Sequence, residues 1–270
     1  MIDSSVWQKV EHTQCFDSWS RLTDRELEKL YESFNEIKLL KKYCGDIKGT
    51  SFFEIGCATG ELYRYLTERF PNFSHVGFDI SKNTILRVKE KSPKGEFFVC
   101  SPDLINDLAQ FEKPSVVFSR DVVHHQLKPY DFLNTLLKLP TEALIVRIRT
   151  LDKGESILDP EQSCQWHYEG WVPYLVLNSD EVIETILKTR RVKLISVLKH
   201  YQILGGHNGR YLPKQCYDPT IGTAETAFFV QFSQEDEKPK IVVEVNKDSI
   251  PAYSLFQRSW RFVKNRIVWT

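Results

Sequence analysis

The sequence predicts an α/β protein with a doubly wound, mostly parallel sheet that has helices on both faces. Two observations predict this fold class. Between residues 51 and 150, short apolar segments alternate with amphipathic segments of helical periodicity. A helix between successive strands is the connection that parallel strands require, so these segments form βαβ units. We expect a sheet of seven strands, with an N-terminal helical extension and a C-terminal appendage.

The first expected element is a helix from about Thr23 to Tyr43. Thr23 and Glu26 have the spacing of a capping box, in which each side chain accepts a hydrogen bond from a backbone amide at the helix start. Apolar residues then recur at helical spacing. The preceding segment carries three aromatic residues and is expected to be an arm or short helix that covers another part of the protein: Trp7, Phe16 and Trp19.

The sheet elements follow in strict alternation. Apolar runs predict strands over 51–56, 75–81, 95–101, 115–119 and 142–150, and amphipathic runs predict helices over 61–70, 83–91, 103–111 and 130–140. After residue 150 the alternation stops. We then expect a helix capped by Ser179, strands over 192–204, 226–233 and 241–245, and a tail helix over 254–267. The expected domains are a helical extension (1–50), a ligand-binding α/β domain (51–233, with an insert over 151–178) and an appendage (234–270).

Composition excludes several classes of protein. Among 270 residues, 36 basic and 36 acidic side chains cancel, whereas a dedicated nucleic-acid-binding domain usually has a basic excess. The sequence has no apolar run long enough to span a bilayer and no N-terminal signal peptide pattern, so we expect a cytoplasmic protein. Six scattered cysteines form no C-x-x-C pair, which predicts free thiols and no metal site: Cys15, Cys44, Cys57, Cys100, Cys164 and Cys216.

The most informative segment is a glycine loop between the first strand and the following helix, Glu54 to Gly60. Glycine lets a ligand approach the backbone, and the helix start offers unpaired amides to an anionic group. The loop lacks the Gly-Lys-Ser/Thr ending of a P-loop, and Ala58 and Glu61 stand where a G-x-G-x-x-G loop has glycines. The remaining pattern is acidic-x-Gly-x-x-x-Gly.

This loop resembles motif I of the class I S-adenosylmethionine-dependent methyltransferases. Asp79 ends the second strand, where a carboxylate can accept hydrogen bonds from both ribose hydroxyls of an adenosine. The segment 118–125, FSRDVVHH, resembles the part of the family that follows strand four. The resemblance covers 51–149 closely and 151–233 loosely, and it implies a Rossmann-like fold and S-adenosyl-L-methionine as the cofactor.

The resemblance implies a set of cofactor-binding residues. The loop would hold the methionine part, Asp79 the ribose and Ile80 the adenine, with the fourth strand beside the sulfonium: Glu54, Gly56, Cys57, Gly60, Asp79, Ile80, Asp103, Ser119 and Arg120. Asp103 lies one position later than the family's usual acid and could instead cap its own helix. Asp79 could likewise be a cap, and the glycines plain turn residues. Ala58 replaces a glycine common in the family, which is tolerable if its φ stays negative.

Methyl transfer to a hydroxyl needs a group that removes the acceptor proton, and a positioned histidine suits neutral pH. His125 is the first candidate because it follows the strand expected beside the cofactor, and His167 is the second; His207 is a further candidate. We expect His124 to point away. Each histidine could instead be structural.

The insert carries an aromatic cluster that could stack on an acceptor, plug the sheet edge or form a dimer contact: Trp166, His167, Tyr168, Trp171 and Tyr174. The loop 205–209 could act as a lid. The basic, amphipathic tail helix could lie on an anionic membrane, but we expect it to dock on the protein itself. A homodimer is compatible with these features.

The function that these patterns favour is methyl transfer to an O or N atom of a small molecule, such as a sugar, a surface-glycan precursor or a secondary metabolite. A macromolecular acceptor, tRNA or protein, is the alternative, although the neutral charge argues against RNA. A catalytically silent partner subunit that keeps the cofactor site is the third hypothesis.

Overall fold

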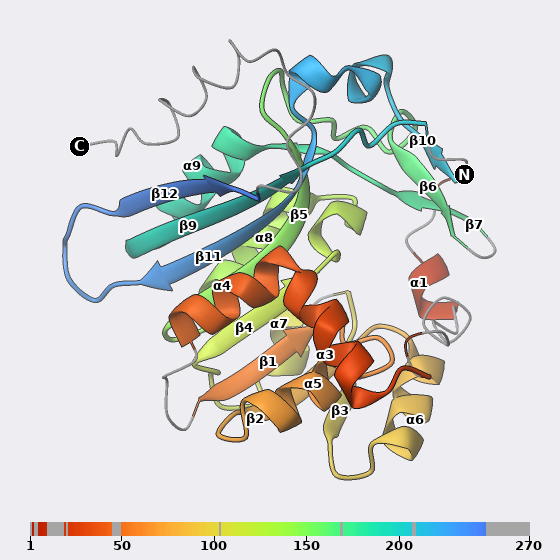
Figure 1. The fold of residues 1–270 in the computed structure, drawn as a ribbon, viewed down its shortest axis with the longest axis vertical. Helices are drawn as coiled ribbons and strands as arrows, with labels where there is room; N and C mark the ends of the chain where they lie inside the picture. The colour runs from red at the N-terminus through yellow and green to blue at the C-terminus, as the bar shows by residue number, and fades with distance from the viewer. Residues whose placement is uncertain are drawn as a thin grey trace.

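The protein has one large mixed sheet covered by helices on both faces (Figure 1). The structure, a computed structural model, describes residues 2, 5–9, 19, 21–44, 50–102, 104–167, 170–206 and 209–246. Several predicted features therefore lie outside the described residues: Cys15, Phe16, Asp103, Tyr168, His207 and the tail helix over 254–267.

The strand order of the large sheet is β12-β9-β11-β5-β4-β1-β2-β3, with β8 paired to β5. The bounds are β1 Ser51–Ile55, β2 Ser74–Asp79, β3 Glu96–Val99, β4 Val116–Arg120, β5 Ala143–Leu151, β8 Leu177–Asn178, β9 Val192–Tyr201, β11 Ala224–Phe232 and β12 Lys240–Val245. Only β11 runs antiparallel to its neighbours, β5 and β9. The doubly wound, mostly parallel sheet is confirmed. Within the described residues the sheet has nine strands, because β8 and β12 join the expected seven, and β12 lies parallel to β9.

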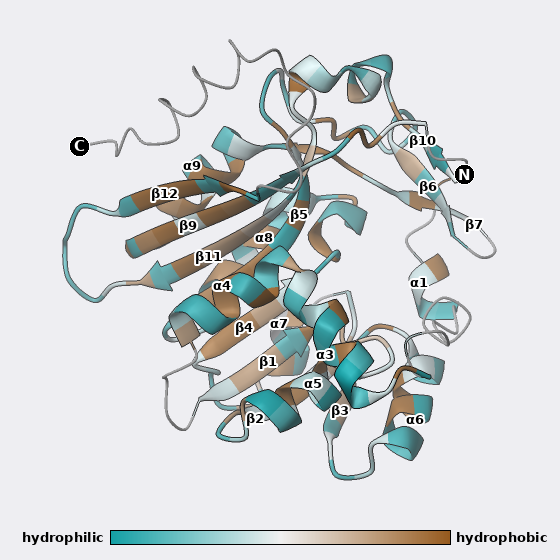
Figure 2. Ribbon diagram, viewed as in Figure 1, coloured by the Kyte–Doolittle hydropathy of each residue, from teal (hydrophilic) through white to brown (hydrophobic). Residues whose placement is uncertain are grey.

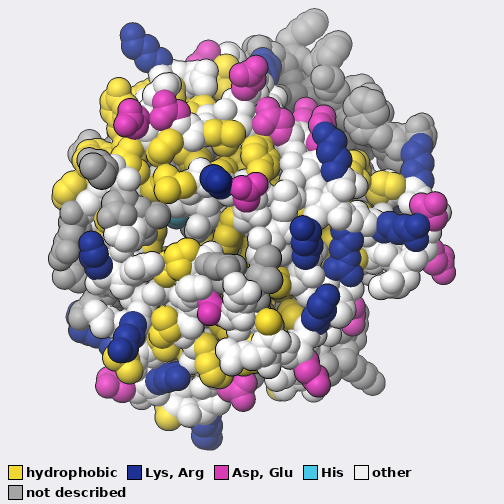
Figure 3. Space-filling view, turned by 180° about the vertical axis from the view of Figure 1, so that it is seen from behind, with side chains coloured by type: hydrophobic (Ala, Val, Ile, Leu, Met, Phe, Trp, Pro, Cys, Tyr) yellow, Lys and Arg dark blue, Asp and Glu magenta, His cyan; other side chains and the backbone are white. Residues whose placement is uncertain are grey.

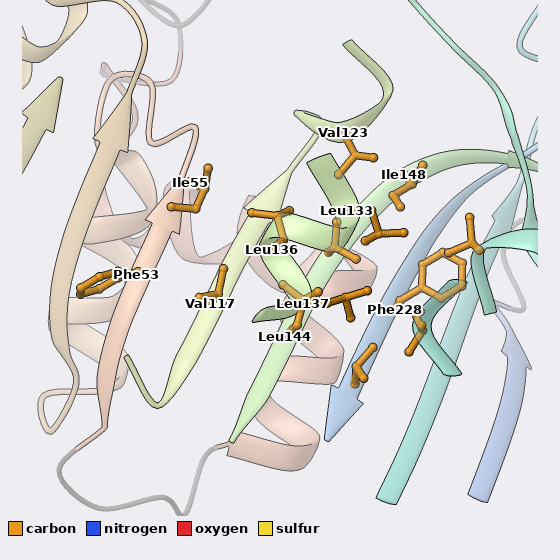
Figure 4. Close-up of a cluster of buried hydrophobic side chains, with 14 of the residues drawn as sticks. Phe53, Ile55, Val117, Val123, Leu133, Leu136, Leu137, Leu144, Ile148 and Phe228 are labelled. Carbon is orange, nitrogen blue, oxygen red and sulfur yellow. The ribbon is translucent and has the colours of Figure 1, made fainter. Parts of the chain in front are cut away.

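Two helical layers cover the sheet. On one face lie α3 (Asp24–Ser33), α4 (Asn35–Cys44) and α5 (Glu61–Arg69), and on the other α7 (Leu104–Leu108), α8 (Pro129–Lys138) and α9 (Ser179–Thr189), while α6 (Lys82–Lys91) packs against β3. Successive strand residues enter opposite cores: Phe52 packs under α4 and α5, and Phe53 packs on the other face. Leucines of α8 meet β4 and β5 in the second core (Figure 4). Apolar strands therefore lie between helices whose outer faces are hydrophilic (Figure 2).

The predicted helix over Thr23–Tyr43 is two helices. The capping box of Thr23 and Glu26 is confirmed at the start of α3. The helix breaks at Phe34, whose φ of −78° and ψ of 139° are extended. The break lets α3 pack on α5 while α4 turns onto β9 and β11. Helical periodicity continues through the break, so the sequence alone does not reveal it.

The residue that caps helix α9 lies one position earlier than predicted. Its N-cap is Asn178, whose side-chain oxygen accepts hydrogen bonds from the amides of Asp180 and Glu181. Ser179 is the first helical residue, so the prediction that it caps the helix was wrong. Both residue types are good N-caps, and sequence could not choose between neighbours.

Two segments of the insert and one from residues 210–211 form a small antiparallel sheet that the sequence did not predict. Its order is β10-β6-β7, with β6 Cys164–His167, β7 Gly170–Pro173 and β10 Arg210–Tyr211. Short helical turns complete the region: η1 Val123–His125, η2 Lys214–Tyr217 and η3 Pro219–Ile221. The N-terminal helix α1 (Val6–Lys9) contacts β7 and α6. In Figure 1 the small sheet and α1 lie together beside the large sheet.

Among the described residues, no helix has the length and apolar character to cross a membrane, and no group of three His, Cys, Asp or Glu side chains could hold a metal ion. Five of the predicted free thiols are confirmed as free and buried: Cys44, Cys57, Cys100, Cys164 and Cys216.

Candidate functional site

A cavity of about 350 Å³ lies at the carboxyl ends of β1, β2, β4 and β5. This is the edge where parallel sheets bind ligands, and β1 and β4 flank the point at which the strand order reverses. The small sheet and α1 contribute to the opposite wall. The volume lies within the range of about 300–1,000 Å³ typical of small-molecule sites. The cavity therefore has the position and the size of a ligand site.

The glycine loop reaches this cavity through Gly56 and Ala58. Gly56 has a φ of +85°, and a Cβ atom there would lie 2.4 Å from Val122 Cγ2. Its amide donates to the Phe78 carbonyl at 2.8 Å, which ties the loop to β2. Gly60 has a φ of +82° and faces Val88. Only glycine fits these two positions without strain, so this turn has a specified shape.

Ala58 departs from the expected backbone. Its φ is +44°, in the left-handed region, whereas the sequence analysis required a negative φ for this residue. Its amide donates to Asp79 Oδ2 at 2.9 Å. The hydrogen bond to a carboxylate offsets part of the steric cost of this conformation, which is about 1–2 kcal/mol for a residue with a Cβ atom.

We expect Ala58→Gly to raise the free energy of unfolding by up to about 1 kcal/mol. Relief of the left-handed strain exceeds the entropy that glycine adds to the unfolded chain, about 0.4–1 kcal/mol. Denaturant unfolding without ligand measures the change. Ala143→Gly, in the ordinary strand β5, is the matched control and should destabilise. Equal destabilisation by both changes would contradict the strain argument.

Asp79 lines the cavity with a carboxylate that is already oriented. Oδ2 accepts from Ala58, and Oδ1 accepts from the Ser81 amide at 2.9 Å. A carboxylate oxygen can accept more than one hydrogen bond, so Asp79 is chemically suited to a ligand with hydroxyl groups. The N-cap of α6 is Ser81, whose hydroxyl accepts a hydrogen bond from the Thr84 amide. Asp79 is therefore not the N-cap of this helix. Ile80 lines the cavity beside it.

Four of the predicted cofactor residues lie behind the cavity wall, namely Glu54, Cys57, Gly60 and Ser119. Glu54 Oε2 pairs with His75 Nε2 at 2.9 Å, and burial raises the pKa of this carboxyl. The Cys57 side chain packs with Phe97 in a small apolar cluster. These side chains support the loop from behind, whereas Arg120 lines the cavity itself.

His125 faces the cavity in one defined tautomer. Its Nδ1 lies 2.6 Å from the Pro173 carbonyl, which can only accept, so Nδ1 carries the proton. Burial lowers the pKa of His125 to about 4, so the ring is neutral at pH 7. Nε2 then holds an available lone pair. The ring is thus in the unprotonated form that a general base requires.

His124 is also part of the cavity wall, and its side chain is fully buried. Its ring lies 4.3 Å from that of His125, and burial lowers its pKa well below the usual range. The Leu175 amide donates to the His124 carbonyl at 2.8 Å. Hydrogen bonds of both histidines therefore connect residues 173–175 to η1.

His167 and the N-terminal arm meet over the cavity. The Trp7 ring lies 4.4 Å from the His167 ring and 4.8 Å from the His125 ring. The expectation that the arm covers another part of the protein is confirmed for Trp7. Trp166 and Trp171 instead pack edge to face on the exposed side of the small sheet, because side chains alternate along β6.

A buried group of charged residues supports the strand ends. Arg147 pairs with Asp121, Glu36 and Glu225, and Arg149 with Asp121 and Glu225. Burial raises the pKa of Asp121, but the charges of Arg147 and Arg149 outweigh it and hold that pKa well below its usual range. Three basic residues therefore balance three acidic ones, since Arg120 also pairs with Glu36 at 3.1 Å.

Sequence reasoning missed several cavity residues, namely Asp121, Arg149, Gln165 and Arg210. One signal was present. Arg147 and Arg149 stand two positions apart in an otherwise apolar strand, and that spacing puts both on one face. Two buried cations on one face require acidic partners, which Glu36 and Glu225 supply. For Gln165 and Arg210 the sequence carries no such signal.

Comparison with known proteins bears on this site. Residues 53–139 match the sequence profile of a family described as a methyltransferase domain. No curated protein sequence matches the chain. Solved structures share the fold at low identity. The N-terminal domain of EvdMO1, crystallised with SAH and D-fucose, is 12% identical, with a TM-score of 0.53 over 79% of this chain and 84% of that one.

Two further structures show the same fold. The [4+2]-cyclase SpnF is 10% identical, with a TM-score of 0.55 over 86% of this chain and 97% of that one. The PH0226 protein from Pyrococcus horikoshii OT3 is 16% identical, with a TM-score of 0.52 over 83% and 99%. Because one of these proteins is described as a cyclase, the fold by itself does not specify the reaction.

Proposed function

We propose that this chain, whose residues 53–139 match a methyltransferase-domain profile, uses S-adenosylmethionine to transfer a methyl group to an O or N atom of a small molecule. One observation carries the proposal. The glycine loop with Asp79 and the neutral His125 line the same cavity, so a cofactor end and an acceptor end adjoin. The acceptors that fit are a sugar, a glycan precursor or a secondary metabolite.

The residues at the cofactor end fit the expected group. Gly56 leaves no side chain where a Cβ atom would clash, and Asp79 places in the cavity wall a carboxylate of the kind that binds a ribose diol. Ile80 and Leu104 add apolar wall, which suits a purine ring. When bound, S-adenosylmethionine supplies a methyl carbon activated by a sulfonium charge. The protein then has to orient the acceptor and exclude water.

His125 is proposed to accept the proton that the acceptor loses. The Pro173 carbonyl fixes the ring, and Nε2 remains deprotonated at neutral pH. Trp7 and Tyr174 restrict the ring from two sides, with centroids 4.8 and 5.8 Å away. A base held in one orientation contributes roughly 10²–10⁴-fold to rate.

The enclosure of the site favours a small acceptor over a macromolecule. The cavity of about 350 Å³ must hold both substrates, and its outer wall is built from α1 and the small sheet. Basic side chains share the rear face with acidic ones, as the net charge of zero implies (Figure 3). A long anionic polymer therefore has no dedicated basic track there. The D-fucose in the EvdMO1 crystals belongs to that protein and does not identify this acceptor.

Calorimetry with S-adenosylmethionine and S-adenosylhomocysteine tests the cofactor site. A methyl-release assay on sugars, metabolites, tRNA and protein then tests the acceptor. We expect binding of both cofactor forms and turnover with a small molecule. Turnover only with tRNA or protein would refute the small-molecule proposal, and binding without any turnover would indicate a silent partner subunit.

We expect His125→Gln to lower kcat by about 10²–10⁴-fold, because glutamine cannot accept a proton at neutral pH. Binding of S-adenosylhomocysteine should change little. Wild-type activity should stay level from neutral pH downward and fall as the pH approaches about 4, where Nε2 becomes protonated. A pH–rate profile measures this. An unchanged kcat in the variant would exclude His125 as the base.

A further inference from the structure

Arg210 is a cation held in the cavity wall by neutral groups. Its guanidinium carbon lies 4.4 Å from the centroid of the Tyr174 ring. Its Nε donates to Gln165 Oε1 at 3.4 Å, a long hydrogen bond between paired residues of β10 and β6. Stacking on an aromatic face leaves the edge of the guanidinium, with its N–H groups, open to a partner.

The other arginines at this end of the sheet are neutralised. Arg120, Arg147 and Arg149 each lie within 4.0 Å of at least one carboxylate oxygen. Over the part of the chain that the structure describes, no carboxylate oxygen lies within 4.0 Å of Arg210. One positive charge therefore faces the cavity without a counter-ion from the described residues.

His124 also contacts the Tyr174 ring on which Arg210 stacks, with the two ring centroids 5.2 Å apart. Both ring nitrogens of His124 are buried, and neither has a hydrogen-bond partner among the described residues. Buried polar atoms are normally satisfied, so unsatisfied groups that line a cavity indicate that a polar ligand completes them.

We propose that Arg210 binds an anionic oxygen group, a carboxylate or a phosphate, on the acceptor substrate. The proposal rests on the methyl-transfer function above and narrows its substrate class to acidic small molecules. A guanidinium matches either group with two parallel N–H···O bonds. Arg210 and His125 both contact the Tyr174 ring, at 4.4 and 5.8 Å, so an anionic group on Arg210 would lie near the acceptor atom that faces His125.

A titration of ¹⁵N-labelled protein with small probes tests the site without turnover. The probes are acetate, inorganic phosphate and acetamide, the last a neutral match for acetate. The arginine Nε–H signals report binding, and Arg210→Gln identifies the signal of Arg210. We expect acetate or phosphate to shift this signal with an affinity at least tenfold above that of acetamide, and the two anions show which source the site prefers.

The variants sharpen the test. Arg210→Gln should weaken anion binding about ten- to hundredfold, the size of a charge-assisted hydrogen bond. The anion affinity of Arg210→Lys should lie between those of wild type and Arg210→Gln. Arg191 is an exposed arginine before β9, so Arg191→Gln should leave anion binding unchanged. Equal response to acetate and acetamide, or anion binding unchanged in Arg210→Gln, would overturn the proposal.

The methyltransferase proposal is tested independently of the anion site. It is rejected if calorimetry shows no binding of S-adenosylhomocysteine. The probe titration is therefore run both with and without S-adenosylhomocysteine. Anion binding at Arg210 without cofactor binding would retain the anion site and reject the methyltransferase function of the cavity.

Discussion

Asp79→Asn should weaken the binding of S-adenosylhomocysteine at least about hundredfold. The carboxylate is proposed to accept from two ribose hydroxyls, and hydrogen bonds to a charged group contribute about 1.5–3 kcal/mol each. Asparagine keeps the shape but has only one acceptor oxygen. Its amide group would also face a backbone N–H, from Ala58 or Ser81, so the loop itself would lose a hydrogen bond. Calorimetry measures the affinity.

Asp131→Asn is the matched control for this prediction, because Asp131 is exposed on α8. It should leave binding unchanged. Thermal unfolding without ligand separates a folding defect from a lost contact. Should folded Asp79→Asn protein bind the cofactor product within threefold of wild type, the carboxylate does not hold the ribose and the cofactor site is placed wrongly.

Arg147→Met should destabilise the protein by about 3–5 kcal/mol, the cost of removing one partner from a buried ion pair. Arg147 is 5% exposed and pairs with three acids, so the change leaves Asp121 and Glu36 short of a counter-charge. The melting temperature should fall by roughly 6–20 °C. Calorimetric melting at pH 7 is the measurement.

Acid should reduce the difference between Arg147→Met and wild type. The pKa of Asp121 is depressed in the folded protein, so its stabilising contribution is present above the unfolded value of about 4 and is lost as the pH falls through the folded value. The wild-type protein therefore loses more on acidification than the variant does. A difference that stays constant down to pH 3 would show that the ion pairs contribute little.

Two comparison variants complete this test. Arg191→Met changes an exposed arginine and should alter stability by less than about 0.5 kcal/mol. Adding Glu36→Leu to Arg147→Met removes one of the stranded carboxylates and should restore part of the loss. A double variant less stable than the single one would indicate that packing, not charge, is at stake.

Sequence was sufficient for the elements that repeat locally. The alternation of apolar and amphipathic segments specified β1 to β5 and their connecting helices. A buried strand shows as a continuous or alternating apolar run and a helix as a period of 3.6 residues, and both patterns are local to the segment. The loop from Gly56 to Gly60 was also predictable, since its positive φ angles demand glycine. Ala58, with a positive φ and a Cβ atom, was not.

Features set by contacts between distant segments were not predictable. The break at Phe34 exists because α3 and α4 pack on different surfaces, and Phe34 then stacks 3.7 Å from the Arg120 guanidinium. The family resemblance placed Glu54 and Cys57 at the cofactor. The Glu54 side chain pairs with His75, and the Cys57 side chain packs in an apolar cluster with Phe97, so both contacts involve segments distant in the chain.

By itself, the amino-acid sequence determined the doubly wound sheet, the glycine loop and the acid at the end of β2, all of which depend on short-range spacing. Only the tertiary structure decided that His124 and His125 both line the cavity and that Trp7 covers it. It also decided that Arg210, 85 positions after His125 in the chain, lines the same cavity. The physical reason is that a cavity is made where several segments meet. Its charge balance depends on which side chains are paired elsewhere, and no local pattern records that.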